Sequence, residues 1–353
     1  MLKITPPSES PLIVYLKNHH DQFEIEEPNE IDQFIFTILS YTKFENIRED
    51  IKFPITIKKY SELYPIDDTS KGGIYISLLS QLARNKRYQN VAIIDFMKST
   101  SIEEEKQFAY MAFRLPNKNI FVSYRGTDAT LVGWKEDLNM AYLAEIPAQK
   151  EALDRLNKLM NKYPFSKFYL GGHSKGGALA IFAYQNLSNY KKKRIISVMD
   201  LDSPGLKDDN LNEEEIKKIH TYIPRVSIVG RIYYKKQRVS VVSSINKNIT
   251  QHDAFSWEIE DDKLKILEEL DTGLKLEESS LNKILNNISP WEAEYFINTV
   301  YQLINEYNIQ DVDDILSLKM IIKIVSKIRI LDKDNFTVFK DVFKKIINPK
   351  DEQ

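Results

Sequence analysis

Cysteine is absent from this chain of 353 residues. Without a thiol, the sequence excludes disulfides, thiolate nucleophiles and metal sites that use cysteine. Net charge is also nearly absent, because 49 Lys and Arg residues offset 51 Asp and Glu residues to give a formal charge of −2. So small a charge gives no global basic surface, and we therefore expect no nucleic-acid partner.

Long hydrophobic runs are missing as well. Nowhere does the sequence reach the ~18 consecutive apolar residues that a membrane-spanning helix needs. The opening stretch MLKITPPSES has no apolar segment of the kind found in signal peptides. With a hydrophobic fraction of 42% and a charged fraction of 28%, the composition is that of a globular protein. We expect a cytoplasmic protein with one large domain or two smaller ones.

The pattern of apolar residues divides the chain into three regions. Residues 1–88 have helical spacing in IDQFIFTILSYTKF and a linker bounded by Pro and Asp at LYPIDD, and they predict a helical cap packed on the core. Residues 89–260 alternate strand and helix signals, which predicts an α/β core with a mostly parallel sheet flanked by helices. Its strands include VAIIDFM and FAYMAF, close enough in sequence to form an antiparallel pair. Residues 261–353 read as helical throughout.

Glycine is scarce, yet four of the chain's eleven glycines fall in the seven residues GGHSKGG. Apolar residues precede this stretch as a buried strand would, and ALAIFA follows it as a tightly packed helix would. Gly172 to Gly176 match G-x-S-x-G, in which a strained turn between strand and helix lifts the serine hydroxyl above the sheet. Ser174 is therefore the candidate nucleophile.

A serine hydroxyl needs a base to take its proton, and histidine is the usual one. The chain has five: His19, His20, His173, His220 and His252. In the strand–turn–helix architecture the acid and the base follow the serine in the chain. His220 precedes a strand and should lie at the amino edge of the sheet, whereas His252 follows the strand RVSVVSS and should lie at the carboxyl edge, near Ser174. His252 is the candidate base, and His173 is expected to pack beneath the turn.

The carboxylate that orients the histidine should end a strand between Ser174 and His252. RIISVMDLDSPGL supplies Asp200 and Asp202, which share a face of the strand at different depths. Asp202 is nearer the carboxyl end and is the candidate acid, with Asp200 as the alternative. In the alternative interpretation, Asp202 has only a structural role and forms the turn with the following SPG.

An oxyanion that forms on the substrate needs hydrogen-bond donors already aimed at it. The backbone N–H of Lys175, at the start of the helix after Ser174, is one candidate. The loop RGTD after the strand IFVSY supplies the other, Thr127, next to a glycine that permits close approach. We expect Arg125 and Asp128 to brace this loop, together with Asp137.

The motifs YRGTD, GWKEDLNMA, GGHSKGG, DSPG and QHDAFSW, in that order, resemble the class 3 lipase branch of the α/β-hydrolases. They resemble still more closely a bacterial family of uncharacterised lipase-like hydrolases, over residues 30–260. The resemblance implies an α/β-hydrolase fold and a Ser-Asp-His esterase or lipase that acts on an acyl-chain ester without a cofactor. By position it carries over Ser174, Asp202, His252 and the oxyanion threonine Thr127. In class 3 lipases the acid follows the strand that matches RVSIVG, where this chain has Ser227 and Gly230.

Other readings stay open on the sequence alone. The chain could be a catalytically silent hydrolase-fold module that binds a partner or a membrane surface, for which Lys319, Lys323 and Lys327 would supply a basic helix face. A metal enzyme is disfavoured, because the histidines lack ligand spacing. The helical ends either cover the approach to Ser174 or only stabilise the sheet. Acyl length, head group and oligomeric state are not specified.

Overall fold

The computed structural model describes most of the first 270 residues and a few positions beyond them. The described residues are 10–19, 27–42, 52–63, 73–128, 130–140, 143–227, 229–233, 235–270, 289, 291–292, 294–295, 298–299, 337 and 341. None of the helices within this part of the chain is long and apolar enough to cross a bilayer.

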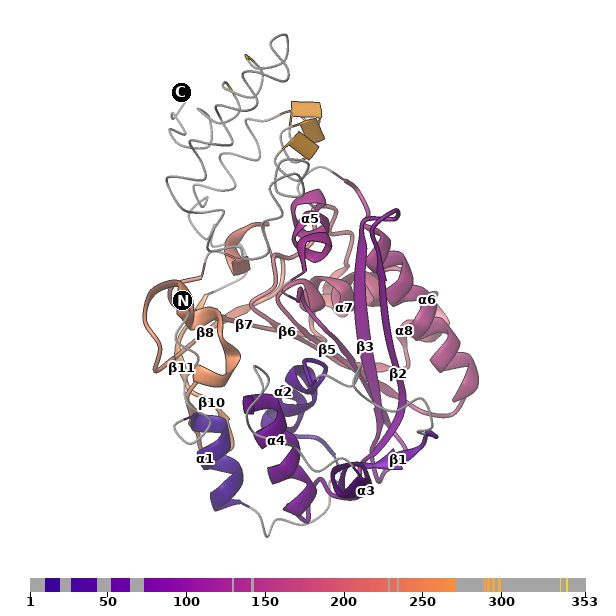
Figure 1. The fold of residues 1–353 in the computed structure, drawn as a ribbon, viewed down its shortest axis with the longest axis vertical. Helices are drawn as coiled ribbons and strands as arrows, with labels where there is room; N and C mark the ends of the chain where they lie inside the picture. Colours follow the sequence, from indigo (N-terminus) through magenta and orange to yellow (C-terminus); the bar gives the residue numbers. More distant parts are fainter. Residues whose placement is uncertain are drawn as a thin grey trace.

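One mixed β-sheet runs through the described residues and has nine strands in the order β1-β2-β3-β4-β5-β6-β7-β8-β11 (Figure 1). The strands are β1 (Ile55–Thr56), β2 (Ala92–Ser101), β3 (Lys106–Arg114), β4 (Ile120–Tyr124), β5 (Phe168–His173), β6 (Ile195–Leu201), β7 (Ile219–Pro224), β8 (Val239–Val242) and β11 (Ile266–Leu270). Strands β4 to β8 pair in parallel, while β1, β2, β3 and β11 join by antiparallel pairing. The predicted large sheet flanked by helices is confirmed, but only its centre is parallel.

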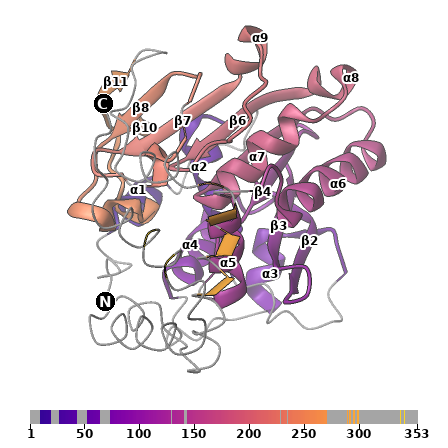
Figure 2. The same ribbon diagram turned by 90° about the horizontal axis from the view of Figure 1, so that it is seen from above.

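Helices cover both faces of this sheet, as Figures 1 and 2 show. One face carries α1 (Pro11–Asn18), α2 (Glu30–Leu39), α3 (Ile57–Leu63) and α4 (Gly73–Arg84), and the other carries α6 (Pro147–Lys162) and α7 (Lys175–Gln185). Shorter elements are α5 (Leu131–Asn139), α8 (Asn189–Lys192), α9 (Glu213–Ile216) and a separate hairpin of β9 (Ile259–Glu260) and β10 (Lys263–Leu264). The layers form a three-layer α/β/α arrangement.

Alternation along the central strands supplies both halves of the core. Phe121 of β4 and Tyr169 of β5 pack with α2 and α4, whereas their neighbours Val122 and Leu170 pack with α6 and α7. Successive side chains of a strand point to opposite faces, so a sheet covered on both faces needs apolar residues at almost every position. This is why the central strands read as continuous hydrophobic runs rather than as alternating ones.

Hydrogen bonds at its amino end fix helix α2 in the layer formed by α1 to α4. Asn29 and Asp32 form a capping box at its amino end, which satisfies backbone N–H groups that have no partner within the helix. The buried Asp32 carboxylate also accepts hydrogen bonds at 2.8 Å from Arg87 Nε and from the Tyr88 hydroxyl, beyond the end of α4. The helix ends at Leu39, and Tyr41 follows it in a turn. Tyr41 is thereby fixed close to the carboxyl ends of the central strands.

Two predicted elements are corrected by the structure. Strand β7 ends at Pro224, so the predicted strand YIPRVSIVG is too long: residues 225–227 lie outside the sheet, and Val229 and Gly230 begin a short 3-10 helix, Val229–Arg231. Residues 266–270, expected to be helical, form β11 and pair with β8. The free edge of β8 has unpaired backbone groups, and β11 satisfies them. The available signal for an extended chain was the period-two pattern KLKI at residues 263–266, which covers β10 and the first residue of β11.

The predicted division at residues 88 and 260 stays a prediction, although the sheet crosses both boundaries through β1 and β11. The predicted linker LYPIDD lies almost entirely outside the described residues. The lysine-rich segment that contains Lys319, Lys323 and Lys327 also lies outside the described residues, as does most of the expected C-terminal helical region.

Candidate active site

Ser174 occupies a strained turn between β5 and α7. Its backbone has φ 57° and ψ −133°, a conformation that costs a residue with a side chain on the order of 1–3 kcal/mol. The turn is held because the Ser174 N–H donates to the Leu201 carbonyl of β6 at 2.9 Å. A Cβ on Gly172 would lie 2.0 Å from the backbone carbon of Gly176. Glycine is thus required where the helix turns back over the strand.

The strained turn brings the Ser174 hydroxyl to the carboxyl end of the sheet, where it is partly exposed. Within the described part of the chain this hydroxyl has no hydrogen-bond partner, so a contact between the Ser174 Oγ and His252 is not formed in this structure. Hydrogen bonds of this kind are often long or unformed without substrate and tighten when it binds.

Asp202 and His252 lie together, although 50 positions separate them in the chain. His252 Nδ1 is 2.6 Å from Asp202 Oδ2, and the Asp202 side chain is fully buried while that of His252 is 32% exposed. His252 ends a 3-10 helix, Asn248–His252, and Asp202 directly follows β6. A carboxylate bound to Nδ1 fixes the imidazole ring and leaves Nε2 to exchange protons with a neighbouring group.

The loop after β7 supports Asp202. The Ser227 hydroxyl donates to Asp202 Oδ1 at 2.5 Å and accepts from the Gly230 N–H at 2.8 Å. A Cβ on Gly230 would lie 2.2 Å from Asp202 Oδ1, so the absence of a side chain there makes room for the carboxylate. Ser227 and Gly230 had stood out in the sequence only because they occupy the region where class 3 lipases carry their acid. Here these residues hold a carboxylate that β6 supplies.

Asp200, the alternative acid, is engaged elsewhere. Its carboxylate accepts from the Thr221 hydroxyl at 3.0 Å and from the Ser203 N–H at 3.3 Å, next to Gly177 in the first turn of α7. Burial raises the pKa of Asp200, and the nearby Lys235 ammonium lowers it in part. No hydrogen bond to His252 is found within the described residues, so the structure brings Asp202 rather than Asp200 to the histidine.

His173 contacts the loop that carries His252. Its Nε2 lies 2.8 Å from the His252 carbonyl oxygen, and the two rings are 4.5 Å apart. On its other side, Nδ1 lies 3.1 Å from the hydroxyl of Tyr41. Burial, and secondarily the neighbouring His252, lowers the pKa of His173 to about 3. Tyr41 was not anticipated, because nothing in the local sequence of the N-terminal region connects it to GGHSKGG.

The loop after β4 runs against the turn at Ser174. A Cβ on Gly126 would lie 2.6 Å from the His173 carbonyl oxygen and 3.2 Å from the Ser174 Cβ. The Thr127 hydroxyl donates to the two carboxylate oxygens of Asp137 at 2.6 and 2.5 Å. Its proton is therefore committed to Asp137, and the donor that Thr127 can offer to a ligand is its backbone N–H. The expected bracing by Asp128 takes the form of a 3.9 Å ion pair with Arg125.

The side chain of Lys175 points into the protein. Its ammonium donates at 2.8 Å to Glu136 and at 2.9 and 2.8 Å to the backbone and side-chain oxygens of Gln107, and it is 3.7 Å from Asp137. Lys175 and Glu136 are almost completely buried. A buried pair of this kind fixes the relative position of α5 and α7, because removing one partner would leave the other charge unpaired. No local sequence pattern indicates this network.

The Mbeg1-like family matches residues 82–302, which is well over half of the chain. The chain belongs to the Mbeg1-like family. The Mbeg1-like match contains Ser174, Asp202 and His252 but not Tyr41. It confirms the resemblance to a lipase-like family inferred from the motifs, while no curated protein matches the chain.

This Mbeg1-like chain is similar to several solved structures, most of which are named as lipases. A mutant of MDLA from Penicillium cyclopium aligns over 67% of this chain and 85% of its own, with 13% identity and a TM-score of 0.43. M37 lipase aligns over 59% and 71%, with 14% identity and a TM-score of 0.39. A lipase from Rhizopus microsporus var. chinensis aligns over 63% and 82%, with 14% identity and a TM-score of 0.37. All three TM-scores are below 0.5, so the residue roles proposed below depend on the geometry of this chain.

The remaining histidines of the Mbeg1-like chain lie elsewhere. His220 is an exposed residue near the amino end of β7, as expected, and His19 follows α1. His20 is outside the described residues. Among the residues that the structure describes, no group of three His, Asp or Glu side chains is arranged to hold a metal ion.

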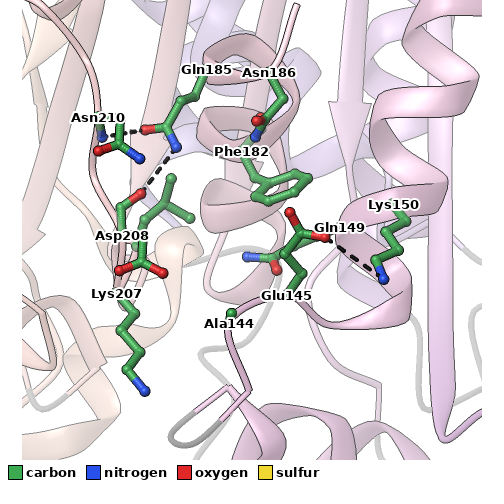
Figure 3. A pocket seen from close by; sticks show the side chains of 11 residues that line it. Ala144, Glu145, Gln149, Lys150, Phe182, Gln185, Asn186, Lys207, Asp208 and Asn210 are labelled. Carbon is green, nitrogen blue, oxygen red and sulfur yellow. Dashed lines mark hydrogen bonds and ion pairs between the residues drawn. The ribbon is translucent and has the colours of Figure 1, made fainter.

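A pocket of about 420 Å³ lies between the amino end of α6, the carboxyl end of α7 and the loop after β6 (Figure 3). Its lining is mainly polar and includes an ion pair of 3.7 Å between Glu145 and Lys150. Gln185 spans it on one side, with hydrogen bonds of 3.0 Å to Asp208 and 2.9 Å to Asn210. None of the predicted site residues lines this pocket.

Proposed function

We propose that the protein is a serine hydrolase that cleaves carboxylic esters through an acyl-enzyme formed on Ser174. The observation that carries the proposal is the 2.6 Å contact between Asp202, which is fully buried, and His252, beside a serine held at positive φ. A buried carboxylate, an imidazole and a strained serine at one edge of a sheet are the parts that nucleophilic acyl transfer requires.

In the proposed reaction, His252 Nε2 takes the proton of the Ser174 hydroxyl as Oγ attacks the ester carbonyl carbon. Asp202 keeps Nδ1–H directed at its carboxylate and stabilises the imidazolium that forms. The backbone N–H groups of Thr127 and Lys175 bind the oxyanion. The imidazolium then gives its proton to the departing alkoxide. Water, deprotonated by His252, attacks the acyl carbon; the bond to Ser174 Oγ breaks, the imidazolium returns its proton to Oγ, and the carboxylic acid is released.

The substrate class that we propose is an ester with an acyl chain, because the chain belongs to a lipase-like family. A peripheral contact with a membrane surface and a cytoplasmic location accord with this proposal. No step of the proposed reaction needs a cofactor.

The experiment that tests the function is labelling of the full-length protein with a fluorophosphonate probe, which phosphonylates a serine only when a base activates it. We expect wild type to be labelled and Ser174→Ala to be unlabelled. Ser166→Ala is a matched control, because this serine precedes the amino end of β5 and its hydroxyl donates to the Lys118 carbonyl.

Labelling should persist in Ser166→Ala and be lost in His252→Ala, and hydrolysis of a short-chain p-nitrophenyl ester should follow the same order. If wild type failed to react at concentrations and times that label a control lipase, the hydrolase proposal would be wrong and the silent binding module would be favoured.

A further inference from the structure

Tyr41 lies outside the segment that matches the Mbeg1-like family, yet its hydroxyl contacts three backbone or side-chain groups around Ser174. Those groups are the Gly126 N–H at 3.1 Å, His173 Nδ1 at 3.1 Å and the His173 carbonyl oxygen at 3.2 Å. The N-terminal layer of helices, α1 to α4, and the turn after α2 thus reach the candidate active site through the Tyr41 hydroxyl. The Tyr41 hydroxyl is hydrogen-bonded both to the loop after β4 and to the end of β5, where the turn at Ser174 begins.

The hydrogens in this cluster can be assigned by elimination. The His252 carbonyl can only accept, so His173 Nε2, at 2.8 Å from it, carries the hydrogen. With a pKa of about 3 caused mainly by burial, the ring is neutral near pH 7 and its Nδ1 is an acceptor. Burial raises the pKa of Tyr41, so its hydroxyl keeps a proton to donate.

The hydrogen of the Tyr41 hydroxyl can be donated either to His173 Nδ1 or to the His173 carbonyl oxygen. The need of the imidazole ring for a donor favours one of the two. If it went to the His173 carbonyl oxygen, the buried Nδ1 would be left without a donor, which costs on the order of 1–3 kcal/mol. Donation to Nδ1 avoids this cost and leaves the Tyr41 oxygen to accept from the Gly126 N–H. The hydrogen bonds then run in one direction, from Gly126 N–H to Tyr41, from Tyr41 to His173, and from His173 to the His252 carbonyl.

This chain of hydrogen bonds joins the loop of the oxyanion threonine to the loop of the candidate base. It begins at the backbone N–H of Gly126, one residue before Thr127, and ends at the backbone carbonyl of His252. The side chain of His252 is the one that must reach Ser174. The Ser174 hydroxyl has no partner yet in the described structure. The reach of His252 toward it therefore depends on where its backbone is held.

We propose that Tyr41 and His173 are positioning residues of the hydrolase site, which set the distance between the His252 ring, Ser174 and the Thr127 N–H. This inference rests on the proposed function. It assigns the N-terminal layer a part in positioning the site, and it gives His173 a role beyond packing beneath the turn.

The test compares Tyr41→Phe with Tyr88→Phe in the full-length protein. Both substitutions remove one hydroxyl from a largely buried tyrosine in the N-terminal layer, but Tyr88 donates to Asp32, away from Ser174. We expect kcat for a short-chain p-nitrophenyl ester to fall on the order of 10- to 100-fold in Tyr41→Phe, because small displacements of reacting groups have effects of this size. KM should stay within about threefold of wild type, and Tyr88→Phe should keep the wild-type kcat.

Substitutions of His173 test its hydrogen bond to the His252 carbonyl separately from its hydrogen bond to Tyr41. His173→Gln keeps an N–H near the position of Nε2 and can still donate to the His252 carbonyl, whereas His173→Leu has the bulk without donor or acceptor. We expect His173→Gln to retain clearly more of kcat than His173→Leu, with both folded by circular dichroism. Equal losses in the two variants would contradict the role of the Nε2–H donor.

A spectroscopic measurement detects the hydrogen bonds of His173 directly, and a role in packing alone would not change its result. In ¹⁵N-correlated spectra of the histidine side chains, His173 should show the neutral Nε2–H tautomer, and Tyr41→Phe should shift its Nδ1 resonance. A wild-type enzyme that turns over the ester while Tyr41→Phe matches it in kcat would overturn the inference and leave the hydrolase function standing. A wild type that neither labels nor turns over would instead overturn the function on which the inference rests.

Discussion

Replacing Asp202 with asparagine is the sharpest test of how the candidate site works. The substitution keeps the size and burial of the side chain but removes its charge. An asparagine amide can also donate to Nδ1, which favours the imidazole tautomer that has its hydrogen on Nε2 and cannot take the serine proton. We therefore expect Asp202→Asn to fold and to lose most of its turnover.

The magnitude follows from the geometry. Asp202 Oδ2 lies 2.6 Å from His252 Nδ1, which puts the centres of the carboxylate and the imidazolium roughly 4 Å apart. At an effective dielectric constant of about 20, two unit charges at that separation attract by ~4 kcal/mol. Since each 1.36 kcal/mol of barrier is tenfold in rate, losing this attraction in the transition state should slow turnover on the order of 10³-fold.

The assay is kcat/KM for a short-chain p-nitrophenyl ester, with folding checked by circular dichroism. Asp200→Asn is the matched control, because Asp200 is equally buried at the end of the same strand but bonds to Thr221 and Ser203. We expect Asp200→Asn to stay within about tenfold of wild type. A larger rate loss in folded Asp200→Asn than in Asp202→Asn would refute the assignment of the acid.

Ser227→Ala removes the hydroxyl that donates to Asp202, and we expect about a tenfold loss of kcat with little change in KM, whereas Ser227→Thr should recover part of it. Lys175→Leu leaves Glu136 buried without its cation, and urea unfolding should show a loss on the order of 3–5 kcal/mol. The pKa of His173 is about 3 in the folded protein against 6.5 for an unperturbed histidine, so its neutral ring contributes stability above pH 6.5 that is lost as the pH falls toward 3. In a urea series from pH 7 to pH 4, His173→Gln should therefore lose less stability than wild type, and parallel losses would contradict the depressed pKa.

Local signals in the sequence were enough to predict the centre of the fold. Apolar runs bounded by turn residues gave the strands from β2 to β6, and the short separation of the first two predicted their antiparallel pairing, which the structure confirms. The edges were not predictable in this way. Strand β1 has two residues, too few for a period, and β11 forms because the exposed edge of β8 needs a partner that lies more than twenty residues further along the chain.

The candidate site likewise contains residues that could be predicted from the sequence and residues that could not. Ser174, Asp202 and His252 could be singled out because glycine spacing, strand ends and chain order each restrict the choice of residue, although their catalytic roles stay a prediction. Tyr41 and the network of Gln107, Glu136 and Lys175 depend on contacts between distant segments. A tyrosine after a helix and a lysine within GGHSKGG have many other uses, so sequence alone gives neither an orientation nor a partner.

The packing of α2 has a practical consequence for anyone who trims this protein. A fragment beginning at residue 82, where the family match starts, would lack the helix whose Phe36 lies 5.4 Å from Phe121 and 5.3 Å from Phe113, ring centre to ring centre. The aromatic face of β3, β4 and β5 would then meet water. Such a fragment should associate through that face rather than remain monomeric. The boundary drawn from family similarity is therefore narrower than the smallest unit of this chain that can fold with a closed core.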